Sequence, residues 1–546
     1  MPTPLSADFY YLSNFQSALA WIGERYEDLL SDEERAFIEQ FTALDLAAQA
    51  LLVRMVMRKG PHFRASKLNY AEIGDIQAPA AQLLALGWLS YSAPLTAEEV
   101  VALLRKDELL AHLPLADRRA SLKKSQLLDQ LLAADPEPQP FARWCPNLAD
   151  SLYSLTVMEL CNRLRLLFFG NLGQDWSEFV LADLGVFRYE TVAITPDSRA
   201  FRSREDLEGY LLLRDHRLRF EAGEAIEDLL ASLTAFASAN PYLQSRHAKL
   251  LYQIAQHQEK QGELAQALDL YRRAEYGDAR WRQLRVLEKL ARHAEAHELA
   301  LQVSAAPRRD QEAQQVQRAL VRLRRSLGLP ADKRRASAPE RRLELTLEQP
   351  VACSVEYAVR EHLQRDDAPV HYVENTLICS LFGLLCWEAV FAPLPGAFFH
   401  PFQSGPADLL SDDFHPRREA LFARCLARLD SDEYRPHIRQ MYQAKFGIQS
   451  PFVFWGLLSE ELLEQALACI PAAHLAACCR RLLRDIRANR AGMPDLIQFY
   501  PAEGRYRMIE VKGPGDRLQD NQKRWLAFCA EQGMPVEVCY VQWAQP

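Results

Sequence analysis

The stretch PDLIQFYPAEGRYRMIEVK, residues 494–512, decides the fold of the C-terminal part of the chain. Polar and apolar residues alternate on both sides of Gly504, the pattern of two strands joined by a glycine-containing turn. A helical pattern follows over about residues 518–532, and PVEVCYV at 535–541 has the composition of a third strand. We therefore expect a small α/β unit.

Two carboxylates and a lysine fall at the ends of the first two strands. Asp495 begins the first, and Glu510 and Lys512 end the second, fifteen residues after the aspartate. Since successive side chains of a strand point to opposite faces, Glu510 and Lys512 are expected on one face and the Val511 side chain on the other. The Val511 carbonyl is then free to bind a metal. This spacing is the PD-(D/E)xK pattern.

These residue types fit the hydrolysis of a phosphodiester. One or two Mg²⁺ ions can activate the attacking water and hold the phosphate. Asp495, Glu510 and the Val511 carbonyl offer the oxygen ligands that Mg²⁺ prefers, and Lys512 can orient the water and neutralise charge. The short pattern also arises by chance, with Glu510 and Lys512 as a surface pair. Its placement on two predicted strands favours the catalytic interpretation.

Composition and charge limit the remaining classes. The chain has 546 residues, enough for about three or four domains, and 49% of them are hydrophobic, which excludes a disordered chain. The formal charge of −8 means that any nucleic-acid surface must be local. Eleven cysteines without a CxxC pair argue against a disulfide framework and a zinc finger, so a cytoplasmic protein is expected, nucleoid-associated if bacterial.

No membrane segment is expected. The N-terminus lacks the basic start and apolar stretch of a signal peptide. The most apolar region, residues 377–402, is interrupted by Glu388 and by prolines, and it is predicted to be a buried helix followed by a turn. There is no P-loop, GxGxxG, HExxH or GxSxG motif, so no nucleotide cofactor is expected either.

The chain before the C-terminal unit is predicted to be mainly α-helical. LTAEEVVALLR and LKKSQLLDQLL, within residues 95–132, resemble the helix pair of a SAP module, a small DNA-binding unit. Between residues 249 and 274, small residues and a tyrosine have the spacing of a tetratricopeptide (TPR) unit, although plain helix packing explains it equally well. Residues 330–339, in a strongly basic stretch, are predicted to be an exposed linker.

The residues also carry a family resemblance. GMPDLIQFY, MIEVKGPGDRLQDNQKRWL and VEVCYV together resemble the virus-type replication-repair nuclease (VRR-NUC) domain. The likeness extends upstream through LLRDIRANRAGMPD, ENTLICSLFGLLCWEAVF and LLVRMVMRKGPHFRASKLNY, so that most of the chain is similar to the Fanconi-associated nuclease family. The resemblance implies a structure-specific endonuclease and 5′-to-3′ exonuclease that uses Mg²⁺ or Mn²⁺, acts on 5′ flaps and takes part in interstrand crosslink repair.

The resemblance also assigns further residues. Glu374, seven residues before LFGLLCW, matches the third metal carboxylate of the family, whereas Glu388 does not match that position. Arg487 matches an arginine that holds a DNA phosphate near the cut. The animal enzymes have a lysine nine residues after the catalytic lysine, but this chain has Asn521 there, which leaves the phosphate pocket and the cutting interval undetermined. No zinc finger for ubiquitin is present.

Four domains are expected. They are a helical DNA-binding domain at 1–85, a SAP-like module at 90–140, a helical linker and TPR-like domain at 145–345, and a VRR-NUC nuclease domain at 350–546. Branched or flapped double-stranded DNA is the expected partner. The basic residues proposed to contact its phosphates are Arg54, Lys59, Arg64, Lys67, Lys123, Lys124, Arg487 and Arg490.

Two other functions fit parts of the sequence. The helical layers could dock DNA or a partner protein beside a catalytically silent nuclease fold, although the intact set of acids and lysine favours activity. An RNA-processing nuclease would use the same metal site. Cleavage of matched RNA and DNA flaps distinguishes these possibilities.

Overall fold

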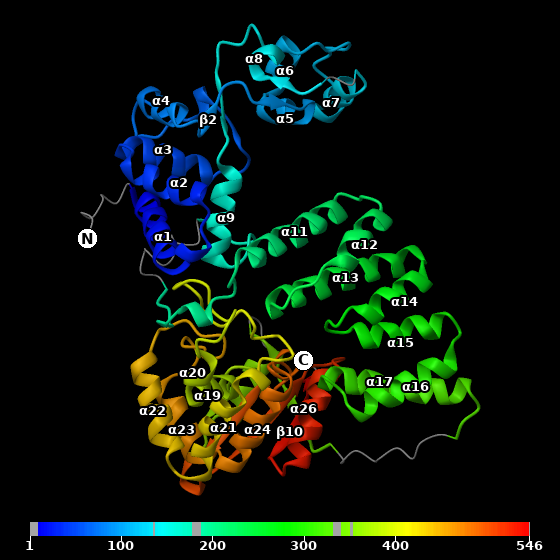
Figure 1. Cartoon of the computed structure of the whole chain (residues 1–546). Coiled ribbons are helices and arrows are strands. Elements are labelled where there is room, and N and C mark those ends of the chain that lie inside the picture. The colour runs from blue at the N-terminus through cyan, green and yellow to red at the C-terminus, as the bar shows by residue number, and fades with distance from the viewer. Residues whose placement is uncertain (1–8, 135–136, 177–186, 331–339, 350–352, 545–546) are drawn as a thin grey trace. The chain divides into compact units, whose positions relative to one another are not determined.

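A computed structural model describes residues 9–134, 137–176, 187–330, 340–349 and 353–544 (Figure 1). The chain forms two compact units. The first comprises residues 1–186 and 201–207, and the second comprises residues 187–200 and 208–546. The predicted linker at 330–339 lies almost entirely outside the described residues.

The first unit begins with a helical domain that carries a small sheet. Its helices are α1 (Tyr10–Tyr26), α2 (Asp32–Ala43), α3 (Leu46–Val56), α4 (Gln77–Ala85) and α9 (Met158–Phe169). Strands β1 (His62–Arg64), β5 (Leu152–Leu155) and β2 (Leu89–Ser90) form an antiparallel sheet in that order. Helix α3 is apolar almost all round and is buried accordingly. The sequence pattern did not predict these short strands.

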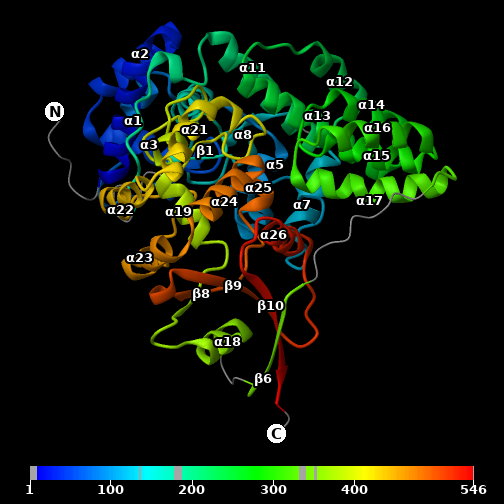
Figure 2. The same ribbon diagram turned by 90° about the horizontal axis from the view of Figure 1, so that it is seen from below.

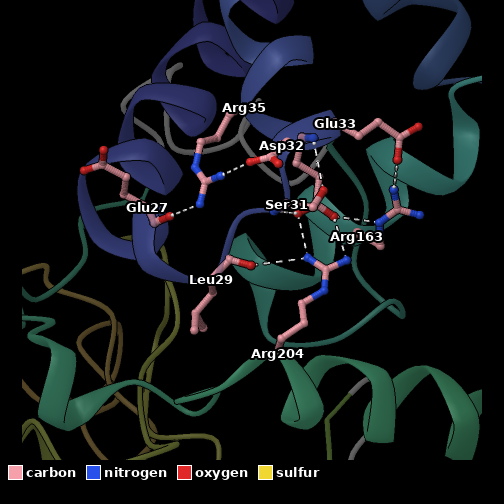
Figure 3. Close-up of polar contacts among 9 residues, drawn as sticks. Glu27, Leu29, Ser31, Asp32, Glu33, Arg35, Arg163 and Arg204 are labelled. Atoms are coloured by element: carbon pink, nitrogen blue, oxygen red, sulfur yellow. Dashed lines mark hydrogen bonds and ion pairs between the residues drawn. The ribbon is translucent and has the colours of Figure 1, made fainter.

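A buried carboxylate, Glu34, fastens this domain together. Ser31 caps α2 and exchanges hydrogen bonds with Glu34, whose side chain is 0% exposed. Arg163 from α9 and Arg204 from the start of α11 approach this end of α2 (Figure 3), and their guanidinium groups lie 2.6 and 2.7 Å from the carboxylate. Burial acts to raise the pKa of Glu34, but these hydrogen bonds outweigh it and hold the pKa below its ordinary value.

The SAP-like module is a separate lobe of the first unit with its own apolar core. It contains α5 (Ala97–Leu103), α6 (Lys106–His112), α7 (Lys124–Leu132) and α8 (Phe141–Trp144), together with the paired strands β3 (Pro94–Leu95) and β4 (Gln139–Pro140). Thr96 and Glu99 form a capping box at the start of α5. Both predicted helices are present, and the segment between them adds α6.

A layer of consecutive helices forms most of the next part of the chain. These are α11 (Arg204–Glu221), α12 (Ile226–Ala235), α13 (Pro241–Gln261), α14 (Leu264–Arg273), α15 (Ala279–Lys289), α16 (His293–Ala305) and α17 (Asp310–Ser326). Each helix from α13 to α17 packs on the next one. Gly262 ends α13 at φ +90°, and Ala267 and Tyr271 are buried against the neighbouring helices, as TPR spacing requires.

A five-stranded sheet forms the centre of the C-terminal part (Figure 2). The order is β6 (Arg342–Leu347), β10 (Val536–Trp543), β9 (Arg505–Lys512), β8 (Leu496–Tyr500) and β7 (Val370–Tyr372). Strand β10 is parallel to β6 and β9, and the other pairs are antiparallel. Strands β8, β9 and β10 match the prediction, whereas β6 and β7 were not predicted. Because β6 belongs to this sheet, the sheet begins before residue 350.

Helices cover both faces of this sheet. Helix α18 (Val355–Leu363) packs on one face, and α26 (Asp520–Glu531) lies on the other with a larger group of helices. That group is α19 (Leu377–Leu385), α20 (Trp387–Val390), α21 (Glu419–Ala427), α22 (Tyr434–Lys445), α23 (Glu460–Cys469), α24 (Ala472–Arg484) and α25 (Ile486–Asn489). The apolar region that begins at residue 377 is thus a buried helix, as predicted.

No single helix within the described ranges is long and apolar enough to cross a membrane. Helices α23 and α24 pass the test of length and composition only as a pair, bent by 109°.

Candidate active site

The sheet brings Asp495, Glu510 and Lys512 to one face. Leu496 pairs with Ile509, so Asp495, directly before β8, and Glu510 on β9 are neighbours one position further along the ladder. Met508 belongs to the core under the helical group, whereas Ile509 and Val511 belong to the core under α18. The alternation predicted from the sequence is therefore present, and the Val511 side chain points away from the two acids.

All three side chains are buried, with exposures of 6% for Asp495, 0% for Glu510 and 8% for Lys512. Asp495 Oδ2 accepts a hydrogen bond of 2.8 Å from the Val511 N–H, which ties β8 to β9. Lys512 Nζ lies 2.8 Å from Glu510 Oε1, an ion pair without hydrogen-bond geometry. Among the described residues, Glu510 Oε2 has no hydrogen-bond partner, and Oε1 has only the Lys512 ammonium beside it. A buried carboxylate oxygen without a partner is costly, and at this position Oε2 is available to a ligand.

The two acids hold their protons more tightly than usual. Burial raises the pKa of Asp495 to about 6, and the charges of Glu374 and Glu356 act in the same direction. Burial and the charge of Asp495 raise the pKa of Glu510 to about 7, against the opposing effect of Lys512. The raised pKa values mean that the positive charge of Lys512 does not balance the burial and mutual repulsion of these two adjacent acids. A divalent cation with oxygen ligands would supply that charge, so these residues fit a metal site.

Glu374 lies in the turn between β7 and α19, next to Asp495. Its carboxylate accepts hydrogen bonds from the Tyr372 hydroxyl, at 2.5 Å, and from Asn375 Nδ2, at 3.1 Å. Its charge contributes to the raised pKa of both Asp495 and Glu510. In the described residues, however, no three His, Cys, Asp or Glu side chains are close enough to hold one ion. The structure thus places Glu374 within electrostatic range of the two acids, with its oxygens bound to protein.

Glu388 is placed elsewhere. It lies on α20, and Arg428 and Arg424 approach its carboxylate at 2.7 and 3.5 Å. Hydrogen bonding and charge from Arg428 hold the pKa of Glu388 below its ordinary value despite partial burial. It is a paired surface acid and does not compete with Glu374.

Two arginines lie just before the strand that carries Asp495. Arg487 on α25 is exposed and lines a cleft of about 260 Å³, whose walls include further arginines at 308, 309 and 484. Arg490 donates to the Pro451 carbonyl at 3.1 Å. Asn521 on α26 packs on Gly492, where an added Cβ would lie 2.8 Å from Asn521 atoms. Residue 521 thus lies beside the segment that carries the two arginines. Its side chain is an uncharged asparagine, where the animal enzymes have a lysine.

The basic residues predicted on the first unit differ in their exposure and in their partners. Lys59, Lys67, Lys123 and Lys124 are exposed, and none forms a salt bridge with a described residue. Arg54 binds Glu72 at 2.5 Å and remains 30% exposed. Arg64, in contrast, is 7% exposed, and its guanidinium group is held by Glu108 and Asp150. Arg64 joins protein segments, so it is not among the DNA contacts that we propose.

Tyr372 and Asn375 were missed in the sequence. Both bind the Glu374 carboxylate, and neither belongs to the PD-(D/E)xK pattern. The available signal was an asparagine directly after a candidate acid, because asparagine favours turns and tolerates a positive φ.

Comparison with known proteins adds independent information. Residues 430–543 match the VRR-NUC domain family, residues 9–90 match the HTH domain of FAN1, and residues 94–144 match the Fanconi anemia-associated nuclease SAP domain.

Full-length relatives match as well. The Fanconi-associated nuclease 1 homolog of Pseudomonas aeruginosa is 58% identical over 99% of this chain and 97% of its own length. The Arabidopsis thaliana homolog is 26% identical over 97% of this chain and 67% of its own length. A crystal structure of paFAN1 bound to DNA with a two-nucleotide 5′ flap and a gap has 57% identity and a TM-score of 0.88, with 100% of both chains covered.

Proposed function

The chain belongs to the Fanconi-associated nuclease family, and from that premise we propose that this phosphodiester-cleaving nuclease acts on branched DNA. The proposed activities are endonucleolytic cutting at 5′ flaps and 5′-to-3′ exonucleolytic degradation, in DNA repair that includes interstrand crosslinks. The observation that carries this proposal is the match over the whole chain to a structure bound to 5′-flap DNA.

The family implies dependence on a divalent metal, and we propose Mg²⁺ or Mn²⁺. Asp495, Glu510, the Val511 carbonyl and Glu374 would hold it. A bound ion of this kind makes a water molecule nucleophilic near neutral pH and stabilises charge on the phosphate. The buried Oε2 of Glu510, which has no hydrogen-bond partner among the described residues, and the raised pKa values of both buried acids support this assignment.

Lys512 has a separate role in the proposal. Its ammonium group lies 2.8 Å from Glu510 and provides part of the positive charge beside the two acids. If an ion held Asp495 and Glu510 in their ionised forms, the Lys512 ammonium would be available to the phosphate and the water. A compact cation there stabilises the charge that develops during hydrolysis.

The DNA surface is proposed from cations that are exposed or partly exposed. Arg487 and Arg490 precede the strand of Asp495 and would hold phosphates next to the cut. On the first unit, Lys59, Lys67, Lys123, Lys124 and the partly exposed Arg54 would hold duplex phosphates. Such contacts position DNA without reading its sequence and weaken with salt. The substrate is then selected by its branched shape.

The test compares end-labelled 5′-flap, 3′-flap and single-stranded DNA with a 5′-flap RNA of the same sequence, with Mg²⁺, Mn²⁺ or EDTA. We expect metal-dependent cutting near the 5′-flap junction, preferential for DNA. Preferential cutting of the RNA flap would identify an RNA-processing nuclease. Tight DNA binding without cutting in either metal would identify a docking protein with a silent nuclease fold.

A further inference from the structure

Glu374 is held in a tight turn whose backbone geometry selects its neighbour. The turn runs from Val373 to Thr376, and the Thr376 N–H donates to the Val373 carbonyl at 2.9 Å. The third residue of the turn, Asn375, has φ +56°. Asparagine and glycine tolerate a positive φ better than other residues, which explains the residue type at 375.

The Asn375 side chain joins the two acidic segments. Its Nδ2 donates to Glu374 Oε1 at 3.1 Å, and its Oδ1 accepts from the Met493 N–H at 3.0 Å. Met493 lies two residues before Asp495. One amide group thus contacts the carboxylate on one side and the strand that carries the aspartate on the other.

A second bond continues this connection beyond Pro494. The Val373 N–H donates to the Asp495 carbonyl at 2.8 Å, which extends the pairing of β7 with β8 by one residue. Pro494, between the two anchored positions, has no N–H and cannot contribute a bond of its own. The Asn375 side chain therefore supplies the attachment that the backbone cannot make there.

Glu374 needs such a restraint because its neighbours repel it. Asp495 and Glu510 lie within electrostatic range, and Glu374 is in a turn outside the sheet. The Tyr372 hydroxyl binds its other oxygen. Groups that hydrogen-bond a metal ligand fix its orientation, and their loss commonly weakens metal binding about 10- to 100-fold.

We propose that Asn375 is a positioning residue that holds the Glu374 carboxylate against Asp495 so that both acids can meet one divalent cation, with Tyr372 as the second restraint. This inference rests on the proposed metal site. It concerns the affinity of that site for the ion and assigns Asn375 no contact with DNA.

Two variants separate the two bonds of Asn375. Asn375→Gly keeps the positive φ without strain and removes both hydrogen bonds. Asn375→Asp retains an acceptor for the Met493 N–H and replaces the donor to Glu374 with a repelling oxygen. Ala291→Gly is the matched control, because Ala291 has the same φ of +56° in the helical layer. Tyr372→Phe removes only the hydroxyl bond and serves if Asn375→Gly does not fold.

The dissociation constant for Mn²⁺, measured by titration calorimetry on the whole chain without DNA, is the primary readout. The Mn²⁺ concentration for half-maximal flap cleavage is the second. We expect both to rise about 10-fold in Asn375→Gly and in Asn375→Asp, to rise less in Tyr372→Phe and to stay unchanged in Ala291→Gly. Cleavage at saturating Mn²⁺ should largely recover.

Asp495→Ala distinguishes a failure of this inference from a failure of the proposed site. Loss of Mn²⁺ binding in Asp495→Ala with wild-type binding in Asn375→Gly would overturn the positioning role alone. Wild-type binding in Asn375→Asp would also overturn it, because the role would then be the structural bond to Met493. Wild-type Mn²⁺ binding in Asp495→Ala itself would overturn the site assignment.

Discussion

Glu510→Gln should stabilise the metal-free protein while it removes the proposed activity. The Glu510 carboxylate is fully buried, and its pKa rises from 4.5 to about 7, chiefly through burial. A raised acid pKa means that the folded state prefers the protonated form. The contribution of the protonated carboxyl to folding stability is complete below the pKa of the unfolded state, and it is lost as the pH rises through about 7. At about 1.4 kcal/mol per pKa unit, the ionised group costs about 3 kcal/mol at pH 8.

The expected gain is smaller than this cost, because Lys512 loses its ionic partner in the variant. We expect a gain of about 1–3 kcal/mol at pH 8 and less than about 1 kcal/mol at pH 5. Calorimetry of the full chain in EDTA at both pH values measures this as a rise in the melting temperature of the second unit. Glu531→Gln, on an exposed position of α26, is the control and should change stability by less than about 0.5 kcal/mol.

A loss of stability at pH 8 would refute this reasoning, because it would mean that Glu510 and Lys512 form a structural ion pair. An equal gain at pH 5 and pH 8 would also refute it, since the effect would then not come from ionisation. Flap cleavage in Mg²⁺ should be absent from the variant whatever its stability.

Three further results are expected. Glu34→Ala should lower the stability of the first unit by about 3–5 kcal/mol, because it leaves two guanidinium groups without their buried partner. Calorimetry measures this loss, and the control Glu33→Ala, at an exposed neighbouring position, should lower stability by less than about 1 kcal/mol. Mn²⁺ affinity should rise from pH 5.5 to pH 8 with release of protons, because the buried acids have pKa values of about 6 and 7; a pH-independent affinity by calorimetry would contradict their role as ligands. Replacing Lys59 and Lys67 together by alanine should reduce the slope of log affinity against log salt by about 2 for a flap substrate, and an unchanged slope would remove both from the DNA surface.

The sequence predicted the strands that have local signals. Strands β8, β9 and β10 alternate in polarity and are bounded by turn residues, so both their existence and their faces followed from the pattern. Strand β6, RLELTL, also alternates, but the basic segment before it favoured a linker. Its partner β10 is almost two hundred residues further along the chain. Pairing over that separation leaves no local signal, and β7 has only three residues.

The site residues also divide into those with a local signal in the sequence and those without one. The positions of Asp495, Glu510 and Lys512 on one face followed from strand alternation. Glu374 came only from the family resemblance, because β7 and the following turn bring it to the site from more than one hundred residues away. Arg64 was predicted to be a surface cation because its partners, 44 and 86 residues further along the chain, cannot be recognised from sequence.

Cleavage and binding of one 5′-flap DNA by the wild-type protein and by Asp495→Asn test most directly whether the buried acids form the active site. We expect cleavage by the variant in Mg²⁺ and Mn²⁺ to fall by about 100- to 1000-fold or more. Its affinity for the flap, measured with Ca²⁺ in place of the other ions, should change by less than about threefold. Cleavage by the variant at a rate close to that of the wild type would show that the buried acids Asp495 and Glu510 are not the active site.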